Sequence, residues 1–291
     1  MDEPARLLRL GVRVDREHGE VVLAELLELS PGGLEEVDLD DGRVEYALYG
    51  PPGELPSLPD LHALAGDAIV EVTCRGVPGD WAERWRAFHQ PITVPAPPGS
   101  GRPDVHVRPP WERPGPAGAI DVVIDPAQAF GTGAHATTRM CLSLLLELDP
   151  ADDGPLLDVG CGSGVLAIAA AQLGHRPVIG VDHERESVIA AAENAQVNGV
   201  ALDVHRADLR LDALPSARIV LANLLRPLLL DLARALPAPP ANLIASGLLT
   251  GEEDEVAGAF AERLGLHERE RRREGEWAAL WLSASCPGPG G

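Results

Sequence analysis

The chain contains no lysine, and all 24 of its basic residues are arginines. Without a lysine side chain, Schiff-base catalysis, a P-loop and a Ser-Lys hydrolase are excluded. Aromatic residues make up only 3% of the 291 residues, which leaves little for stacking nucleic-acid bases. Basic charge is also scarce, because 45 Asp and Glu outweigh the arginines and give a net charge of −21. Direct binding to nucleic acid is therefore not expected.

Cysteines and long apolar runs are few as well. The four cysteines show no C-x-x-C spacing and no paired histidine pattern, so we expect free thiols in a reducing compartment, with no disulfide framework and no metal site. The longest apolar run, around 165–173, is too short to span a membrane. The first residues lack the basic and apolar segments of a secretory signal. These absences predict a cytoplasmic protein with no membrane segment.

What is present is enough apolar sequence, 45%, for a sizeable core in about two domains. Residues 1–77 form the first domain in this interpretation. Their pattern predicts two helices, at 17–29 and 58–65, and four strands, at 7–14, 34–40, 43–49 and 68–75, with a hairpin turn at Asp41-Gly42. The resulting order β-α-β-β-α-β is that of a small α+β ferredoxin-like domain.

The remaining sequence divides into a connector, a larger domain and a tail. Residues 78–118 predict a helix at 80–89 and then a semi-rigid Pro-rich spacer. Residues 119–285 predict apolar strands separated by helices, which is typical of a doubly wound α/β sheet covered on both faces. The strands are expected at 120–124, 156–159, 177–181, 202–205, 219–222 and 243–246, and the clearest helices at 184–198, 226–236 and 252–264. Residues 286–291 are expected to be a disordered tail.

The most informative stretch is a strand that runs into a glycine-rich turn, with Gly160, Gly162 and Gly164 in the pattern G-x-G-x-G. Glycines let the backbone turn tightly and approach a ligand. A dinucleotide site has the spacing G-x-G-x-x-G, so this turn argues against a nicotinamide dehydrogenase. Asp158, just before the turn, would repel a pyrophosphate but suits a cationic ligand such as a sulfonium cofactor that carries an ammonium. Cys161 is interpreted as a small filler between glycines.

Three further polar residues follow the ends of predicted strands. Asp182 lies about 20 residues after the first glycine, where a carboxylate can accept hydrogen bonds from both ribose hydroxyls. Asp208 is placed either to meet an adenine edge or to act as an ordinary loop carboxylate. The side chain of Asn223 can face the crevice, accept an N–H from an incoming amine and contact the cofactor with its NH₂ group. The alternative for Asn223 is a turn or helix-cap residue.

Four motifs carry a family resemblance. They are D-P-A-Q-A-F-G-T-G-A-H-A-T-T at 125–138, the Trp-rich segments at 80–91 and 107–111, A-N-L-L at 222–225 and G-E-W at 275–277. Together they resemble the bacterial methyltransferases of ribosomal protein L11 over about residues 80–282. The resemblance implies a class I methyltransferase with a seven-stranded Rossmann-like domain and an N-terminal substrate-recognition domain.

The resemblance also implies a cofactor, an acceptor and site residues. Thr138, Gly160, Asp182 and Asn223 would contact S-adenosylmethionine, and Phe130, Gly131, Thr132 and Gly133 would fold over it. Asn223 would orient the acceptor nitrogen. The acceptors would be lysine ε-amino groups and the N-terminal α-amino group of the large-subunit ribosomal protein. The alternatives are another protein lysine, a small amine, or a non-catalytic S-adenosylmethionine-binding protein.

Two questions stay open in the sequence. Residues 1–100 carry 19 acidic and 8 basic residues, so their net negative charge per residue is about twice that of the rest, which favours a basic protein partner but also fits simple solubility. His135 could be a base or make a structural hydrogen bond in its loop, and Thr137 or Thr138 could cap the helix that starts there. A monomer is expected.

Overall fold

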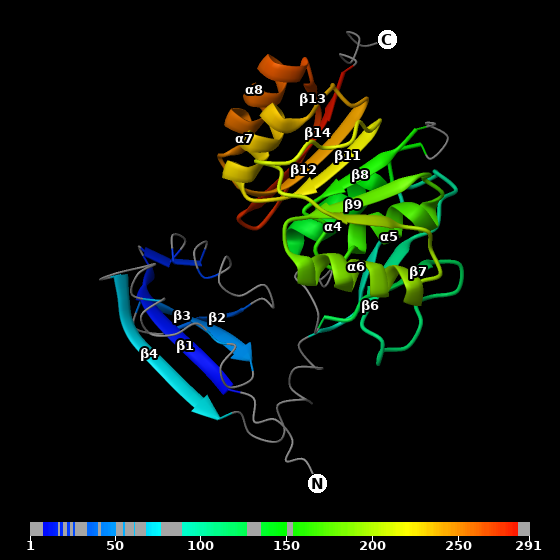
Figure 1. Cartoon of the computed structure of the whole chain (residues 1–291). Helices are drawn as coiled ribbons and strands as arrows, with labels where there is room; N and C mark the ends of the chain where they lie inside the picture. Colours follow the sequence, from blue (N-terminus) through cyan, green and yellow to red (C-terminus); the bar gives the residue numbers. More distant parts are fainter. Residues whose placement is uncertain are drawn as a thin grey trace. The chain divides into compact units, whose positions relative to one another are not determined.

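The computed structural model describes residues 8–16, 18–19, 22–23, 26, 34–39, 42–50, 55, 61, 68–76, 89–126, 135–149 and 154–284. The chain divides into two compact units, residues 1–88 and 89–291, and each is described by itself (Figure 1). No helix in these described ranges is long and apolar enough to cross a membrane.

The first unit contains a four-stranded antiparallel sheet in the order β2-β3-β1-β4. Its strands are β1 (Leu8–Asp15), β2 (Glu35–Asp38), β3 (Arg43–Gly50) and β4 (Ile69–Gly76). Alternate residues of β1 and β3, among them Val12, Val14 and Leu48, are buried in one hydrophobic cluster. The strand order and pairing agree with the predicted ferredoxin-like arrangement, although most of the two predicted helices lies outside the described residues.

The other face of this sheet is polar and is organised around Glu45, which is 5% exposed. Its two carboxylate oxygens accept hydrogen bonds from Arg9 and Arg13 on β1, each at 2.6 Å. Burial alone would raise the pKa of Glu45. The hydrogen bonds from the two guanidinium groups lower it by a larger amount, so the pKa is below its usual value. The first unit thus neutralises its buried carboxylate internally.

The second unit is built on a seven-stranded sheet in the order β10-β9-β8-β11-β12-β14-β13. The first five strands in this order are parallel, and β14 pairs antiparallel with both β12 and β13. The strands are β8 (Leu156–Val159), β9 (Val178–Asp182), β10 (Asp203–Arg206), β11 (Ile219–Asn223), β12 (Asn242–Leu249), β13 (His267–Glu274) and β14 (Trp277–Ser283). This order confirms the Rossmann-like α/β prediction.

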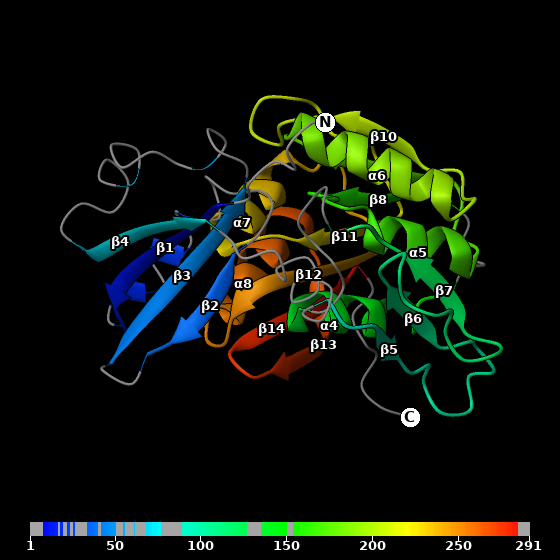
Figure 2. The same cartoon turned by 90° about the horizontal axis from the view of Figure 1, so that it is seen from below.

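Helices cover both faces of this sheet, as Figures 1 and 2 show. They are α4 (Ala136–Leu145), α5 (Val165–Leu173), α6 (Arg185–Val197), α7 (Arg226–Ala235) and α8 (Glu253–Leu264). Alternate strand residues separate the two layers: Leu221 packs with α4 and α5 in one cluster, and Val220 packs with α7 and α8 in the other. A strand buried on both faces needs apolar residues throughout, which explains why the sequence revealed these strands clearly.

The structure corrects the prediction for residues 89–124. Strand β7 (Ile120–Val123) does not join the main sheet; it forms a three-stranded sheet with β5 (Ile92–Val94) and β6 (Val105–Arg108). The expected spacer therefore contains two strands, because Val105 and Val107 bury their side chains in the same cluster as α4 and α5. The predicted helix at 80–89, apart from His89, and the predicted tail lie outside the described residues.

Candidate functional site

The glycine-rich turn joins buried β8 to helix α5 at the carboxyl edge of the sheet. Gly160, Gly162 and Gly164 have φ angles of +71°, +52° and +80°, which only glycine adopts without strain. The N–H of Gly160 donates to the carbonyl of Val181 at 2.8 Å, so the turn is held against β9. A Cβ at Gly160 would lie 2.4 Å from Cδ2 of Leu224, which shows how closely the turn also approaches the end of β11.

Asp158 lies in β8 just before this turn and is 1% exposed. Its Oδ2 accepts the N–H of Ala167 at 3.1 Å, whereas its Oδ1 has no hydrogen-bond partner within the described residues. Burial raises the pKa of Asp158 to about 7, and the nearby charge of Asp182 contributes in the same direction. A buried carboxylate without a cation is costly, and a bound cation would stabilise its ionised form. This environment fits a sulfonium and ammonium ligand.

Asp182 ends β9 and is 7% exposed. Its two oxygens accept the N–H groups of Gly162 at 2.9 Å and of Glu184 at 3.0 Å. The carboxylate therefore links the glycine turn to the start of α6. Because a carboxylate has about four lone-pair positions, these two bonds leave room for ribose hydroxyls. Its neighbour His183 places Nδ1 3.5 Å from one of the oxygens.

Thr138 and Asn223 come together from α4 and β11. Thr138 is 1% exposed, and Nδ2 of Asn223 donates to its Oγ1 at 3.5 Å. The two residues lie 85 positions apart in the sequence, so the fold itself makes this pair. Asn223 ends the strand adjacent to β8, next to the glycine turn. The fold therefore brings these two predicted residues together, and their contact with a cofactor stays a prediction.

A Ser-Gly step in β12, which is not among the site residues predicted from the sequence, completes the edge. The carbonyl of Ser246 accepts the N–H of Leu224 at 2.9 Å. Gly247 has φ +86°, and a Cβ there would lie 2.5 Å from the carbonyl oxygen of Leu224. The step therefore lets the segment after Asn223 pass close to β12. An isolated glycine in an apolar strand is the signal that could have pointed to this close approach.

Asp208 occupies the loop after β10 and has a local role. Its Oδ1 accepts the N–H of Arg210 at 2.9 Å, and its backbone carbonyl accepts the N–H groups of Leu211 and Asp212. These bonds fit the alternative of an ordinary loop carboxylate. The contact with adenine stays a prediction.

His135 is the N-cap of α4, and its Nδ1 lies 2.8 Å from Oγ1 of Thr137. The prediction that Thr137 or Thr138 caps the helix is therefore wrong, because the helix already begins at Ala136. The ring of His135 packs edge-on against Trp277 with 4.7 Å between ring centres, and burial lowers its pKa. These contacts favour the structural interpretation of His135.

Cys161 is buried, and burial raises the pKa of its thiol far above the usual value. A thiol that stays protonated is a poor nucleophile, in agreement with the filler interpretation. Residues Phe130, Gly131, Thr132 and Gly133, predicted to fold over the cofactor, lie outside the described residues.

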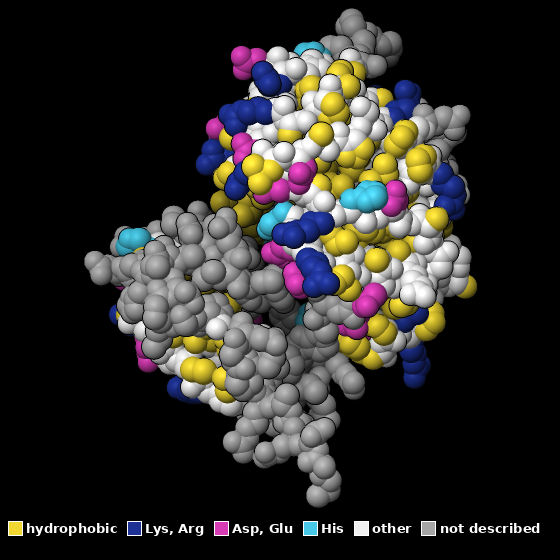
Figure 3. Space-filling view, in the orientation of Figure 1, with side chains coloured by type: hydrophobic (Ala, Val, Ile, Leu, Met, Phe, Trp, Pro, Cys, Tyr) yellow, Lys and Arg dark blue, Asp and Glu magenta, His cyan; other side chains and the backbone are white. Residues whose placement is uncertain are grey.

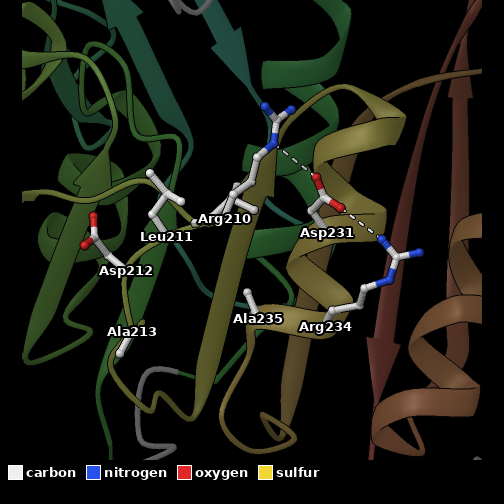
Figure 4. A pocket seen from close by; sticks show the side chains of 8 residues that line it. Arg210, Leu211, Asp212, Ala213, Asp231, Arg234 and Ala235 are labelled. Carbon is white, nitrogen blue, oxygen red and sulfur yellow. Dashed lines mark hydrogen bonds and ion pairs between the residues drawn. The ribbon is translucent and has the colours of Figure 1, made fainter.

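A pocket of about 410 Å³ lies elsewhere, between the loop at 209–213 and helix α7 (Figure 4). Arg210 and Arg234 both contact the carboxylate of Asp231 there, at 3.2 and 3.0 Å. None of the predicted site residues lines this pocket, so the candidate site lies outside it.

The described surface seen in Figure 3 mixes acidic, basic and hydrophobic side chains.

Comparison with known proteins identifies the family. The family model for ribosomal protein L11 methyltransferase (PrmA) matches residues 67–284. Two relatives, the ribosomal protein L11 methyltransferases of Geobacter metallireducens and Heliobacterium modesticaldum, are 40% and 41% identical over 209 and 207 residues. These matches cover 70% and 69% of this chain but only 66% and 63% of the relatives, so the matched part spans just under two thirds of their length.

A solved structure gives the same result. The chain is 29% identical to the ribosomal protein L11 methylase of Lactobacillus delbrueckii subsp. bulgaricus, with a TM-score of 0.57. The match covers 67% of this chain and 98% of the solved chain. Since the family model alone spans most of this sequence, the chain belongs to the ribosomal protein L11 methyltransferase (PrmA) family.

Proposed function

We propose that this protein is an S-adenosylmethionine-dependent N-methyltransferase that acts on ribosomal protein L11 of the large subunit. The acceptors are lysine ε-amino groups and the N-terminal α-amino group. The observation that carries the proposal is the position of Asn223, at the carboxyl end of the strand next to the glycine turn and hydrogen-bonded to Thr138. Family membership supports the substrate, and a ribosomal acceptor places the reaction in the cytoplasm.

Residues at the carboxyl edge of the main sheet would each bind a different part of the cofactor. The positive-φ glycines Gly160 and Gly162 would let the amino-acid part approach the backbone, and the buried carboxylate of Asp158, in the strand just before the turn, would supply negative charge near it. Asp182 would accept the ribose hydroxyls with its remaining lone pairs, and Asp208 would meet the adenine. When bound, S-adenosylmethionine supplies an electrophilic methyl group.

Asn223 then orients the acceptor. Its side-chain oxygen would accept an N–H from the amine and so fix the direction of the nitrogen lone pair. The amine must be neutral to attack, and a lysine side chain has an ordinary pKa of about 10.4. Desolvation of the amine in the crevice lowers that pKa, so no strong base is required. Positioning supplies the main rate enhancement, and well-oriented systems gain about 7–11 kcal/mol in this way.

The first unit serves substrate recognition in this proposal. Residues 1–100 have a net charge of −11, and those acidic side chains steer a basic ribosomal protein toward the enzyme. Raising the ionic strength should therefore lower the association rate more than the rate of methyl transfer.

The test is a transfer assay with a cofactor that carries a labelled methyl group and purified large ribosomal subunits. We expect label in L11 and in no other ribosomal protein. Label in another protein or in a small amine, with none in L11, would reject the substrate assignment but keep the enzyme class. The variant Asn223→Ala is the control, and its transfer rate should fall at least 100-fold.

A further inference from the structure

Two asparagines lie one turn apart, Asn194 in helix α6 and Asn198 at its C-cap, and they bond to the end of strand β7 and to the segment that follows it. Positions four residues apart lie on the same side of a helix. Asn194 is 3% exposed, and Asn198 is half-buried. Neither was singled out from the sequence, where an asparagine on a helix looks like an ordinary surface residue.

Asn198 bonds to the last residue of β7 and to its own helix, and its Oδ1 also accepts a bond from Nε2 of Gln172 on α5 at 3.5 Å. Its Oδ1 accepts the N–H of Val123 at 2.8 Å, and its Nδ2 donates to the Val123 carbonyl at 2.7 Å. The same Nδ2 lies 2.8 Å from the backbone carbonyl of Asn194. Asn198 therefore fixes the end of β7 to α6 and does not reach the glycine turn with these bonds.

Asn194 connects two different segments of the candidate site. Its Oδ1 accepts the N–H of Asp125 at 3.1 Å, at the start of the 125–138 motif. Its Nδ2 donates to the carbonyl of Ser163 at 2.9 Å, between the second and third glycines of the turn. One buried amide thus holds the first residue of the motif and the glycine turn at a fixed separation.

The glycine turn is consequently held from two sides. Asp182 accepts the N–H of Gly162 on one side, and Asn194 donates to the carbonyl of the next residue on the other. Helix α6 also packs closely here, since a Cβ at Gly164 would lie 3.0 Å from the Cβ of Ala191. These bonds set the orientation of the peptide groups in the turn, and the peptide groups are what a cofactor meets there.

Only a side chain with a donor and an acceptor on one short planar group fits both bonds of Asn194. Aspartate is nearly the same shape but has no donor in its ionised form, so it would place a carboxylate oxygen against the carbonyl of Ser163. Serine is too short to reach both partners at once. The buried environment makes the loss of either partner costly.

We propose that Asn194 is a positioning residue for the cofactor: it couples the glycine turn to the start of the 125–138 motif and so fixes the turn in its binding geometry. This inference rests on the proposed function, because it concerns the same S-adenosylmethionine site. It assigns no contact between Asn194 and the cofactor itself.

The test compares two isosteric variants of the full chain, Asn194→Asp and Asn198→Asp. Each keeps its acceptor. Asn194→Asp loses the bond donated to Ser163, and Asn198→Asp loses the bonds donated to the carbonyls of Val123 and Asn194. Calorimetry gives the affinity for S-adenosylmethionine, and thermal unfolding without cofactor gives stability. We expect both variants to unfold at lower temperature, whereas only Asn194→Asp weakens cofactor affinity at least tenfold; Asn198→Asp should stay within threefold of wild type.

Equal losses of affinity in the two variants would show a merely structural role and overturn the inference, as would an unchanged affinity in Asn194→Asp. If that variant does not fold, Asn194→Ser replaces it with the same expectations. Wild-type protein that does not bind the cofactor would overturn the proposed function together with the inference. Wild-type binding with indistinguishable variants would overturn the inference alone.

Discussion

Each of the two units contains a buried carboxylate, and the two carboxylates differ in their hydrogen-bond partners and in the direction of their pKa shifts. In the first unit, Glu45 accepts hydrogen bonds from two guanidinium groups at 2.6 Å, and its pKa is lowered. In the second unit, Asp158 is more deeply buried, has a single backbone donor within the described residues, and has a pKa raised to about 7. The first carboxylate is satisfied by the protein itself. The second has no positively charged partner within the described residues, and the proposed cationic ligand would supply one.

The largest expected effect concerns Asp182, which ends β9, the strand next to the one that carries Asp158. Replacing Asp182→Ala removes the acceptor for Gly162 and Glu184 and the proposed acceptor for the ribose hydroxyls. We expect S-adenosylmethionine affinity, measured by calorimetry, to fall at least 100-fold, which is about 2.7 kcal/mol. Unchanged affinity would show that the ribose assignment is wrong. It would also weaken the distinction between a carboxylate that serves the fold and one that serves a ligand site.

The second prediction tests the internally satisfied carboxylate. The change Glu45→Gln removes the counter-charge that Arg9 and Arg13 share and leaves Arg13 with the exposed Glu71 alone. Because both guanidinium groups are partly exposed, we expect a loss of about 1–3 kcal/mol in the free energy of unfolding of the first unit. Denaturant titration measures it. Cofactor affinity should be unchanged, and a tenfold loss would contradict the separation drawn between the two carboxylates.

The third prediction tests Asp158. The variant Asp158→Asn keeps the shape of the side chain and removes its charge. We expect cofactor affinity to fall about tenfold, because the proposed cationic ligand loses a complementary charge, while thermal stability without cofactor rises at pH 8. A variant that loses stability and keeps full affinity would show that the charge serves the fold.

The fourth prediction is that the two carboxylates give opposite dependences of stability on pH. The folded pKa of Asp158 is raised, so its contribution to stability is fully present below about pH 4 and is lost as the pH rises to about 7. The folded pKa of Glu45 is lowered, so its contribution is present above about pH 4.5 and is lost as the pH falls.

The measurement is the unfolding free energy of wild type minus that of each neutral variant, taken from pH 3.5 to pH 8. The difference for Asp158→Asn should become more negative up to about pH 7 and then stay level. The difference for Glu45→Gln should become more positive as the pH rises from the acid end. If the two differences changed with pH in the same direction, the opposite pKa shifts of Asp158 and Glu45 would be contradicted.

Much of the second unit could be predicted from the sequence because its chemistry is local. The strands at β8, β9 and β11 are short apolar runs, and the helix predicted at 184–198 is observed as α6. The glycine spacing pointed to the turn, and all three glycines have positive φ. Each of these features depends on residues that are neighbours in the chain.

Features that depend on distant partners could not be read in this way. Strand β13 has the sequence H-E-R-E-R-R-R-E, which shows no apolar alternation. Its arginines instead pair with acidic residues on α8 and elsewhere, for example Arg273 with Glu253 at 2.6 Å. The two bonds of Asn194 likewise join residues that lie 31 and 69 positions away. Such pairings are decided by the tertiary fold.

The charged strand β13 also determines where the main sheet stops. It lies at one end of the strand order, and the other end is β10, whose Asp203 and His205 lie 3.0 Å apart. Both outer strands therefore present charged side chains along their length, in contrast to the apolar strands between them. A strand from another molecule that paired with either edge would have to bring its own side chains against these charges. The charged side chains of the two outer strands thus disfavour edge-to-edge pairing between the sheets of different molecules, which would otherwise lead to fibrous self-association.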